Sequence, residues 1–152
     1  MTIFIKPSNG QFCIAVFNTG DSVIELSHVA FVKNEAAIID FLNQRVGIEK
    51  AYFDGTVHYQ TAMSIRQKMD LQGILLIYKQ DSKNIHERIE AQHEWILENI
   101  YFVEEYKRDA DYIYFVQLLS DYNKTNPNCD PIAADIMADA ARHLRKQAIV
   151  NN

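Results

Sequence analysis

The chain has 152 residues, the length of one ordinary domain, so residues 1–152 are expected to fold as a single unit. Hydrophobic residues make up 48% and charged residues 23%, proportions that exclude a disordered tail and a coiled-coil rod. The net charge of −5 argues against a domain that binds DNA through phosphate neutralisation alone, so contact with DNA would need a divalent metal, a local basic patch or a partner.

The first part of the chain predicts three strands joined by short turns. The runs 2–6, 11–17 and 22–31 are rich in β-branched and aromatic residues, and turn-forming clusters at 7–10 and 18–21 separate them. Turns this short connect antiparallel neighbours. We therefore expect an antiparallel meander.

Helix and strand then alternate. The expected segments, in chain order, are a helix at 34–46 capped by Asn34, a strand at 50–53, a helix at 57–69 and a strand at 73–78. The last of these, GILLIY, is apolar throughout, which is typical of a strand buried on both faces.

Three more helices complete the pattern. They are expected at 81–98, 109–122 and 130–146, with a candidate edge strand at 100–103. Asp81 or Ser82 is the expected cap of the first helix. Asp130 and Pro131 suit the cap and the first residue of the last one.

Three antiparallel strands followed by alternating helix and strand is the element order of the ribonuclease H-like fold. The predicted class is therefore α/β, with a five-stranded mixed sheet flanked by helices. Because helices connect the later strands, these strands should run parallel. Strand 50–53 should lie beside strand 2–6, and strand 73–78 beyond it.

Four loose motifs follow one another in the second half of the chain. They are KNIHERI at 83–89, WILENIYF at 95–102, an aromatic helix with Gln-Leu at 112–119, and DPIAADIMADA at 130–140. Their order resembles the nuclease domain of viral and phage terminase large subunits, the DNA-packaging motors. The resemblance implies a metal-dependent endonuclease that cuts concatemeric viral DNA during packaging.

The same resemblance implies a carboxylate site for two Mg²⁺ or Mn²⁺ ions. Its ligands come from the first strand, the end of the fourth strand and the start of the last helix. Asp54, Asp130 and Asp135 match the last two places, and Asp139 matches less well than Asp135. These three, Asp54, Asp130 and Asp135, are the expected metal ligands and catalytic residues. Without any metal, Asp54 and Asp130 would still serve as helix caps.

The first strand departs from the family pattern. Where the pattern has Asp before Pro, this chain has Lys6 before Pro7. An ammonium at that place should lie within salt-bridge reach of Asp54 and compete with a divalent ion for its carboxylate. The expected function is the active nuclease, and the alternative is a catalytically inactive ribonuclease H-like module that docks into a packaging complex or contacts DNA. A third, a resolvase-like nuclease, requires a homodimer and a basic junction-binding face, for which the composition offers little.

The resemblance also implies partners. They are double-stranded DNA, an ATPase motor domain and other packaging proteins such as the portal and the small terminase. No GxxxxGK[ST] motif occurs, so the motor must lie on another segment or chain. No apolar run approaches the ~18–20 residues of a membrane helix, so no membrane partner is expected. The implied location is the host cell cytoplasm.

Other constellations carry less weight. His86, Glu90 and Glu94 recur at the spacing of stacked metal ligands on one helix, but a salt-bridging surface face explains them better. Cys13 lies in an apolar strand and is expected to be a buried hydrophobe. Cys13 and Cys129 form no CxxC motif, which argues against a zinc site.

Overall fold

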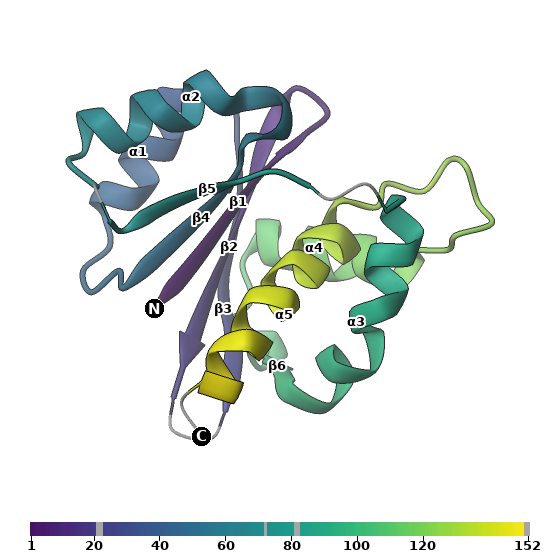
Figure 1. Cartoon of the computed structure of the whole chain (residues 1–152). Helices are drawn as coiled ribbons and strands as arrows, with labels where there is room; N and C mark the ends of the chain where they lie inside the picture. The colour runs from purple at the N-terminus through teal and green to yellow at the C-terminus, as the bar shows by residue number, and fades with distance from the viewer. Residues whose placement is uncertain (21–22, 72, 81–82, 151–152) are drawn as a thin grey trace.

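A mixed six-stranded sheet forms the centre of the protein, in a computed structural model that describes residues 1–20, 23–71, 73–80 and 83–150 (Figure 1). Its strands lie in the order β5-β4-β1-β2-β3-β6. They are β1 (Thr2–Ser8), β2 (Gln11–Thr19), β3 (Ile24–Val32), β4 (Lys50–Asp54), β5 (Leu75–Tyr78) and β6 (Ile100–Phe102).

The pairing of the strands confirms the predicted topology. The first three strands form the antiparallel meander. β4 pairs with β1 in parallel, and β5 pairs in parallel with β4 on the outer side. The sheet differs from the expected one by its sixth strand, because the candidate edge strand pairs in parallel with β3.

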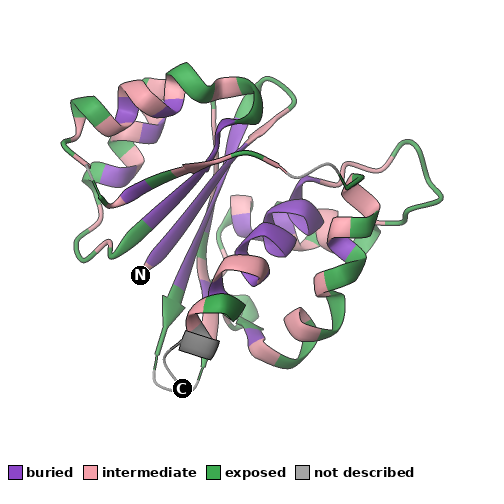
Figure 2. Ribbon diagram, viewed as in Figure 1, coloured by how far each residue is buried: buried purple, intermediate pink, exposed green. Residues whose placement is uncertain are grey.

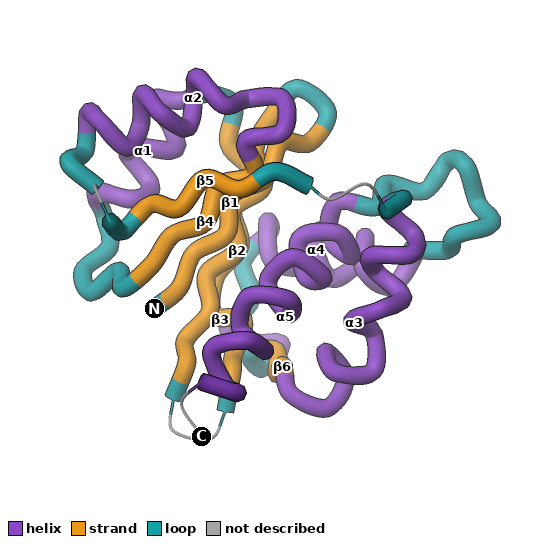
Figure 3. The backbone as a smooth tube through the Cα atoms, viewed as in Figure 1, coloured by secondary structure: helices purple, strands orange, loops and turns teal. Residues whose placement is uncertain are grey.

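Helices cover both faces of this sheet (Figures 1 and 3). One face carries α1 (Glu35–Asn43) and α2 (Gly55–Lys68), and the other carries α3 (Ile85–Asn99), α4 (Ala110–Asp121) and α5 (Ile132–Val150). A single 3₁₀ turn, η1 (Glu105–Lys107), precedes α4. The two faces bury separate apolar clusters, since successive strand residues point to opposite sides.

β1 lies in the middle of the sheet, and its first five residues are all buried (Figure 2). Ile3 and Ile5 point toward α1 and α2, whereas Phe4 points toward α5. By the same alternation Lys6 shares the face of Phe4. The strand therefore carries a lysine into the interior, under α5.

Two local expectations need correction. GILLIY was expected to be buried on both faces, but β5 is an edge strand in which only Leu75 is buried and Leu76 is 38% exposed. α3 starts at Ile85 with Asn84 as its cap, where Asn84 Oδ1 accepts a hydrogen bond from the Glu87 amide. Asp81 and Ser82, the expected caps, lie outside the described residues.

Other helix starts follow the sequence closely. Asn34 caps α1 by accepting a hydrogen bond from the Ala37 amide, and Asp109 caps α4 in the same way through the Tyr112 amide. Each cap satisfies one of the backbone donors that a helix start leaves unpaired. Asn34 was the predicted cap, and Asp109 opens the helix predicted at 109–122.

The step from β4 to α2 is unusually tight. Asp54 ends the strand and caps the helix, and Gly55 is already helical. A Cβ atom on Gly55 would lie 2.5 Å from Cγ2 of Ile77 on the neighbouring strand. The absence of a side chain at 55 therefore allows β5 to pack beside the start of α2.

Gly55→Ala is expected to lower the free energy of unfolding by about 1–3 kcal/mol, the usual cost of overpacking a closely packed site. Denaturant unfolding of Gly55→Ala, Ile77→Ala and the double variant measures this cost. The added methyl should cost less in the Ile77→Ala background, because the clashing Cγ2 is then absent. Strictly additive changes would contradict the packing explanation.

Candidate functional site

A lysine and three aspartates meet where β1, β4 and α5 come together. Lys6 Nζ lies 2.8 Å from Asp54 Oδ2, 2.8 Å from Asp139 Oδ2 and 3.1 Å from Asp135 Oδ2. Asp54 stands at the end of β4, and the other two stand one helical turn apart on α5. The expected salt bridge between Lys6 and Asp54 is therefore confirmed.

The four charged groups are inside the protein. Lys6 and Asp54 are each 5% exposed, Asp135 is 4% exposed and Asp139 is 2% exposed. Ionised groups at this depth require partners, because losing their hydration costs several kcal/mol per ion. Within the cluster, each carboxylate has the same ammonium as its partner.

Neighbouring polar groups complete the shell around two of the carboxylates. Asp54 Oδ1 accepts hydrogen bonds from the amide and the hydroxyl of Thr56, at 3.0 and 2.6 Å. Asp139 Oδ2 accepts them from the Tyr78 hydroxyl at 2.6 Å and from Gln80 Nε2 at 2.7 Å. Thr56 lies at the start of α2, Tyr78 ends β5, and Gln80 follows that strand. These hydrogen bonds therefore connect the cluster to α2 and to β5.

Asp135 has a second cation. Arg88 Nη2, from α3, lies 3.2 Å from Asp135 Oδ1 and 3.4 Å from its Oδ2. Arg88 Nε is buried and has no hydrogen-bond partner. The cluster therefore contains three carboxylates against two cations, and it ties α3 as well as α5 to the sheet.

The pKa of Lys6 reflects a competition between burial and attraction. Burial lowers the pKa of the ammonium, but the charges of Asp139 and Asp135 and the hydrogen bonds to Asp139 and Asp54 outweigh it, so the pKa is raised above 10.5. Burial likewise opposes ionisation of Asp54, yet the Lys6 and Thr56 hydrogen bonds hold the pKa of that carboxyl below its ordinary value. Lys6 is charged at neutral pH.

At Asp135 and Tyr78, unlike at Asp54, the effect of burial on the pKa is not overcome by neighbouring groups. Burial raises the pKa of Asp135, with the charge of Asp139 adding to it, and the attraction of Lys6 and Arg88 does not fully offset the rise. Burial and the Asp139 charge raise the pKa of Tyr78 well above its ordinary value. Tyr78 therefore stays a hydrogen-bond donor at neutral pH.

The structure brings together two of the three predicted ligands. Asp54 and Asp135 meet at Lys6, whereas Asp130 makes other contacts: its Oδ1 accepts from the Ile132 amide at 3.0 Å, and its Oδ2 accepts from Asn9 at 3.3 Å. The bond from the Ile132 amide is the helix-start role that an Asp before Pro suggested, and the bond from Asn9 ties it to the turn after β1. Asp139 stands in the cluster instead.

The sequence around Asp139 contained a signal for its burial, because residues 132–141 are almost all apolar apart from the two aspartates. Five alanines of this segment are buried in the structure, namely Ala133, Ala134, Ala138, Ala140 and Ala141. A helix that is apolar on nearly every side has no solvated face, so an aspartate within it must have a buried partner. Asp135 and Asp139, four residues apart, share one face of this helix.

The carboxylates of the cluster suit a divalent metal ion, but Lys6 does not. Three carboxylates are the oxygen ligands that Mg²⁺ and Mn²⁺ prefer. However, the ammonium of Lys6 lies between them, and it carries a competing positive charge and no lone pair. The described residues contain no group of three or more His, Cys, Asp or Glu side chains arranged to hold a metal. With Lys6 in place, the residues do not fit a divalent ion.

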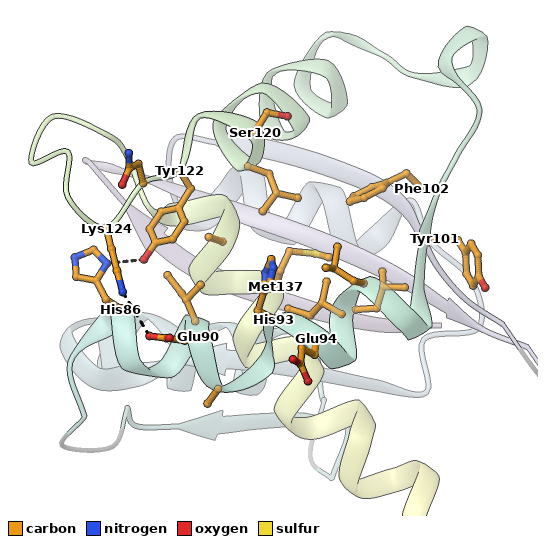
Figure 4. Close-up of a pocket in the computed structure, with 18 residues that line it drawn as sticks. His86, Glu90, His93, Glu94, Tyr101, Phe102, Ser120, Tyr122, Lys124 and Met137 are labelled. Carbon is orange, nitrogen blue, oxygen red and sulfur yellow. Dashed lines mark hydrogen bonds and ion pairs between the residues drawn. The ribbon is translucent and has the colours of Figure 1, made fainter.

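The remaining candidates have structural roles. His86 Nδ1 is hydrogen-bonded to the Tyr122 hydroxyl, and Glu90 faces Lys124 at 4.0 Å (Figure 4). Cys13 is fully buried, as expected, and burial raises the pKa of its thiol. Within the described ranges, no helix combines the length and the apolar character needed to cross a membrane.

Comparison with known proteins identifies the fold. No family model and no curated protein matches the sequence. Among solved structures, the chain is similar to the human cytomegalovirus terminase nuclease domain, with a TM-score of 0.53 and 12% identity over 91% of this chain and 82% of that one. The chain is also similar to the same domain soaked in Mn, with a TM-score of 0.56 and 14% identity over 91% of this chain and 81% of that one. The expected terminase nuclease-like, ribonuclease H-like fold is confirmed.

Lys6→Met is expected to lower the free energy of unfolding at pH 7 by about 3–5 kcal/mol, because three buried carboxylates lose their shared cation. The matched control is Lys68→Met. Lys68 also bonds a carboxylate, Glu35, at 2.7 Å, but its side chain is 60% exposed. That change should cost at most about 1 kcal/mol. Equal costs in urea unfolding would show that burial of the Lys6 cluster does not set its energy.

The cost of Lys6→Met should also depend on pH. Without Lys6, burial and mutual repulsion raise the carboxyl pKa values in the folded variant, so acidification from pH 7 toward the unfolded value of 3.8 stabilises that variant. In the wild type, Asp54 has a lowered pKa, and its contribution is lost only as the pH falls below 3.8 through that lowered value. Asp135 has a raised pKa in the wild type as well, but Lys6 limits that rise, so acidification stabilises the wild type less than the variant. The difference in free energy of unfolding between the wild type and Lys6→Met should therefore become smaller on acidification. A difference that stays constant from pH 7 to pH 4 would contradict this.

Proposed function

We propose that this chain is a catalytically inactive ribonuclease H-like module of the terminase nuclease type, which docks into a DNA-packaging complex and contacts its DNA. One observation carries the proposal. The Lys6 ammonium lies within 2.8–3.1 Å of all three carboxylates at the place where the fold would gather metal ligands. A resident cation that forms part of the chain replaces the need for a bound one.

The energetic case rests on what a metal would have to displace. Lys6 is held by three charged contacts in a buried site, and its pKa is raised rather than lowered. Binding of Mg²⁺ would require moving this ammonium out of the cluster against that attraction, while Arg88 stays beside Asp135. Two cations in one small site repel each other, which lowers the affinity for a third.

DNA contact is supported by cations beside the cluster. Lys83 and Arg142 line a cavity of about 80 Å³ next to Asp139, together with Arg88, which is already paired with Asp135. A local group of basic side chains lets an acidic protein approach a phosphate backbone. In the proposed role, double-stranded DNA passes this surface, and the ATPase motor, portal or small terminase supplies the docking partner.

The second candidate is a metal-dependent endonuclease that cuts concatemeric viral DNA with Mg²⁺ or Mn²⁺. The convergence of Asp54, Asp135 and Asp139 favours it, because three carboxylates in one site are what such chemistry requires. Asp130, the other ligand expected from the sequence, would have to give up its bonds to Asn9 and the Ile132 amide.

Lys6→Asp separates the two functions. The wild type should not bind Mn²⁺ in calorimetric titration and should leave supercoiled plasmid DNA uncut in Mg²⁺ or Mn²⁺. Lys6→Asp replaces a competing cation with a fourth carboxylate, so the variant should bind Mn²⁺ and gain thermal stability from it. Lys6→Asp combined with Asp139→Asn is the matched control, and it should lose most of this affinity.

Cleavage by the wild type would favour the endonuclease, provided that Asp54→Asn abolishes it. Cleavage that survives Asp54→Asn would point to a contaminating nuclease instead. If folded Lys6→Asp fails to bind Mn²⁺, the cluster is not a metal site that Lys6 blocks, and the reason given for inactivity would be wrong.

A further inference from the structure

A hollow in the described surface lies away from the carboxylate cluster. It is a groove of about 1060 Å³ between α3 and α4, with α5 as its floor (Figure 4). α3 and α4 both pack on α5, and the groove separates their outer parts. It runs from Tyr122 at one end to Tyr101 and Phe102 at the other. This groove is defined here as the α3–α4 groove.

Its inner surface is apolar. Ile89 and Ile96 of α3, Leu119 of α4, and Ala134 and Met137 of α5 line it. Ala134 and Met137, which form the floor, are only 4% and 0% exposed, so an occupant would contact mainly the partly exposed Ile96 and Leu119 above them. A surface of this kind is suited to aliphatic side chains.

Apolar side chains also extend beyond the groove to its rim. Leu97 is 71% exposed and Tyr101 is 55% exposed. Both border the groove at the end of α3 and on β6. Grouped exposed apolar residues beside an apolar groove mark an interaction site more often than isolated ones do.

The charge of the rim is uneven. Glu90 and Glu94 lie on the α3 side of the groove, one helical turn apart. The α4 side presents Ser120 and Asn123, which are neutral. Lys124 at one end faces Glu90 at 4.0 Å, and among the described residues Glu94 has no ion-pair partner. An occupant with basic flanks would neutralise this side, whereas the phosphates of a nucleic acid would be repelled.

We infer that the α3–α4 groove binds an amphipathic helix of a partner protein, one with an aliphatic stripe and Lys or Arg beside it. A third helix packs naturally between two helices, at interaxial distances of about 8–10 Å. Helix-in-groove binding uses aliphatic anchors spaced along one face. The inference deepens the proposed docking role and rests on it, since it names the surface and the kind of segment that docks there.

Fluorescence polarisation with synthetic helical peptides tests the inference on the full chain. The probes share one leucine stripe and differ in their flanks, which are Lys in one peptide and Glu in the other. The Lys-flanked peptide should bind more tightly. Glu90→Lys with Glu94→Lys should reverse this preference, and Leu97→Ser should weaken binding of the Lys-flanked peptide about tenfold. These residues are exposed, so the variants should fold.

Asp40→Lys with Glu49→Lys is the matched control. It makes the same change in net charge, and both residues are exposed and outside the groove. It should leave the preference for Lys flanks unchanged. If this control reverses the preference as well, general charge explains the binding and the groove does not.

Two other results would overturn the inference. Equal binding of the two peptides would remove the argument from charge. A dimer in analytical ultracentrifugation that Leu97→Ser dissociates would assign the groove to a second copy of this chain. The plasmid assay decides the proposed function separately, because a cleaving wild type would defeat the inactive role while peptide binding still stood.

Discussion

A lysine inside the central strand is the constraint on which the rest of the structure depends. Lys6 lies under α5 because the alternation of β1 points it there, and a buried ammonium needs anions around it. Asp54, Asp135 and Asp139 meet that need from two other elements. The same contacts therefore fix the end of β4 and hold α5 across the sheet.

Much of the fold could be read from local patterns. The meander, the cap at Asn34 and the parallel pairing of β4 with β1 follow from turn residues, cap chemistry and helical connections. The outer position of β5 was predicted as well, but its exposure was not, because an apolar run looks the same at the edge of a sheet as in its middle. Which strand borders the edge is decided by topology, and β6 has only three residues with which to signal itself.

The site was predictable to the level of residue type, and less so to the level of position. Asp130 precedes α5 and Asp135 lies in its first turn. Spacing alone does not show which turn of this helix faces the sheet. The docking of α5 decides this, and it places Asp135 and Asp139 inward. A fold shared at 12–14% identity does not settle the chemistry of its centre, which here depends on Lys6 and the three aspartates around it.

The span of the Lys6 cluster along the chain has a consequence for biosynthesis. Lys6 and Asp139 are 133 residues apart in sequence, so the first strand is made long before its last counter-ion. During translation the sheet can pair Lys6 with Asp54, but the two carboxylates of α5 become available only after that helix has left the ribosome. The nascent protein must keep that lysine hydrated until then, which makes docking of α5 the step that closes the interior to water.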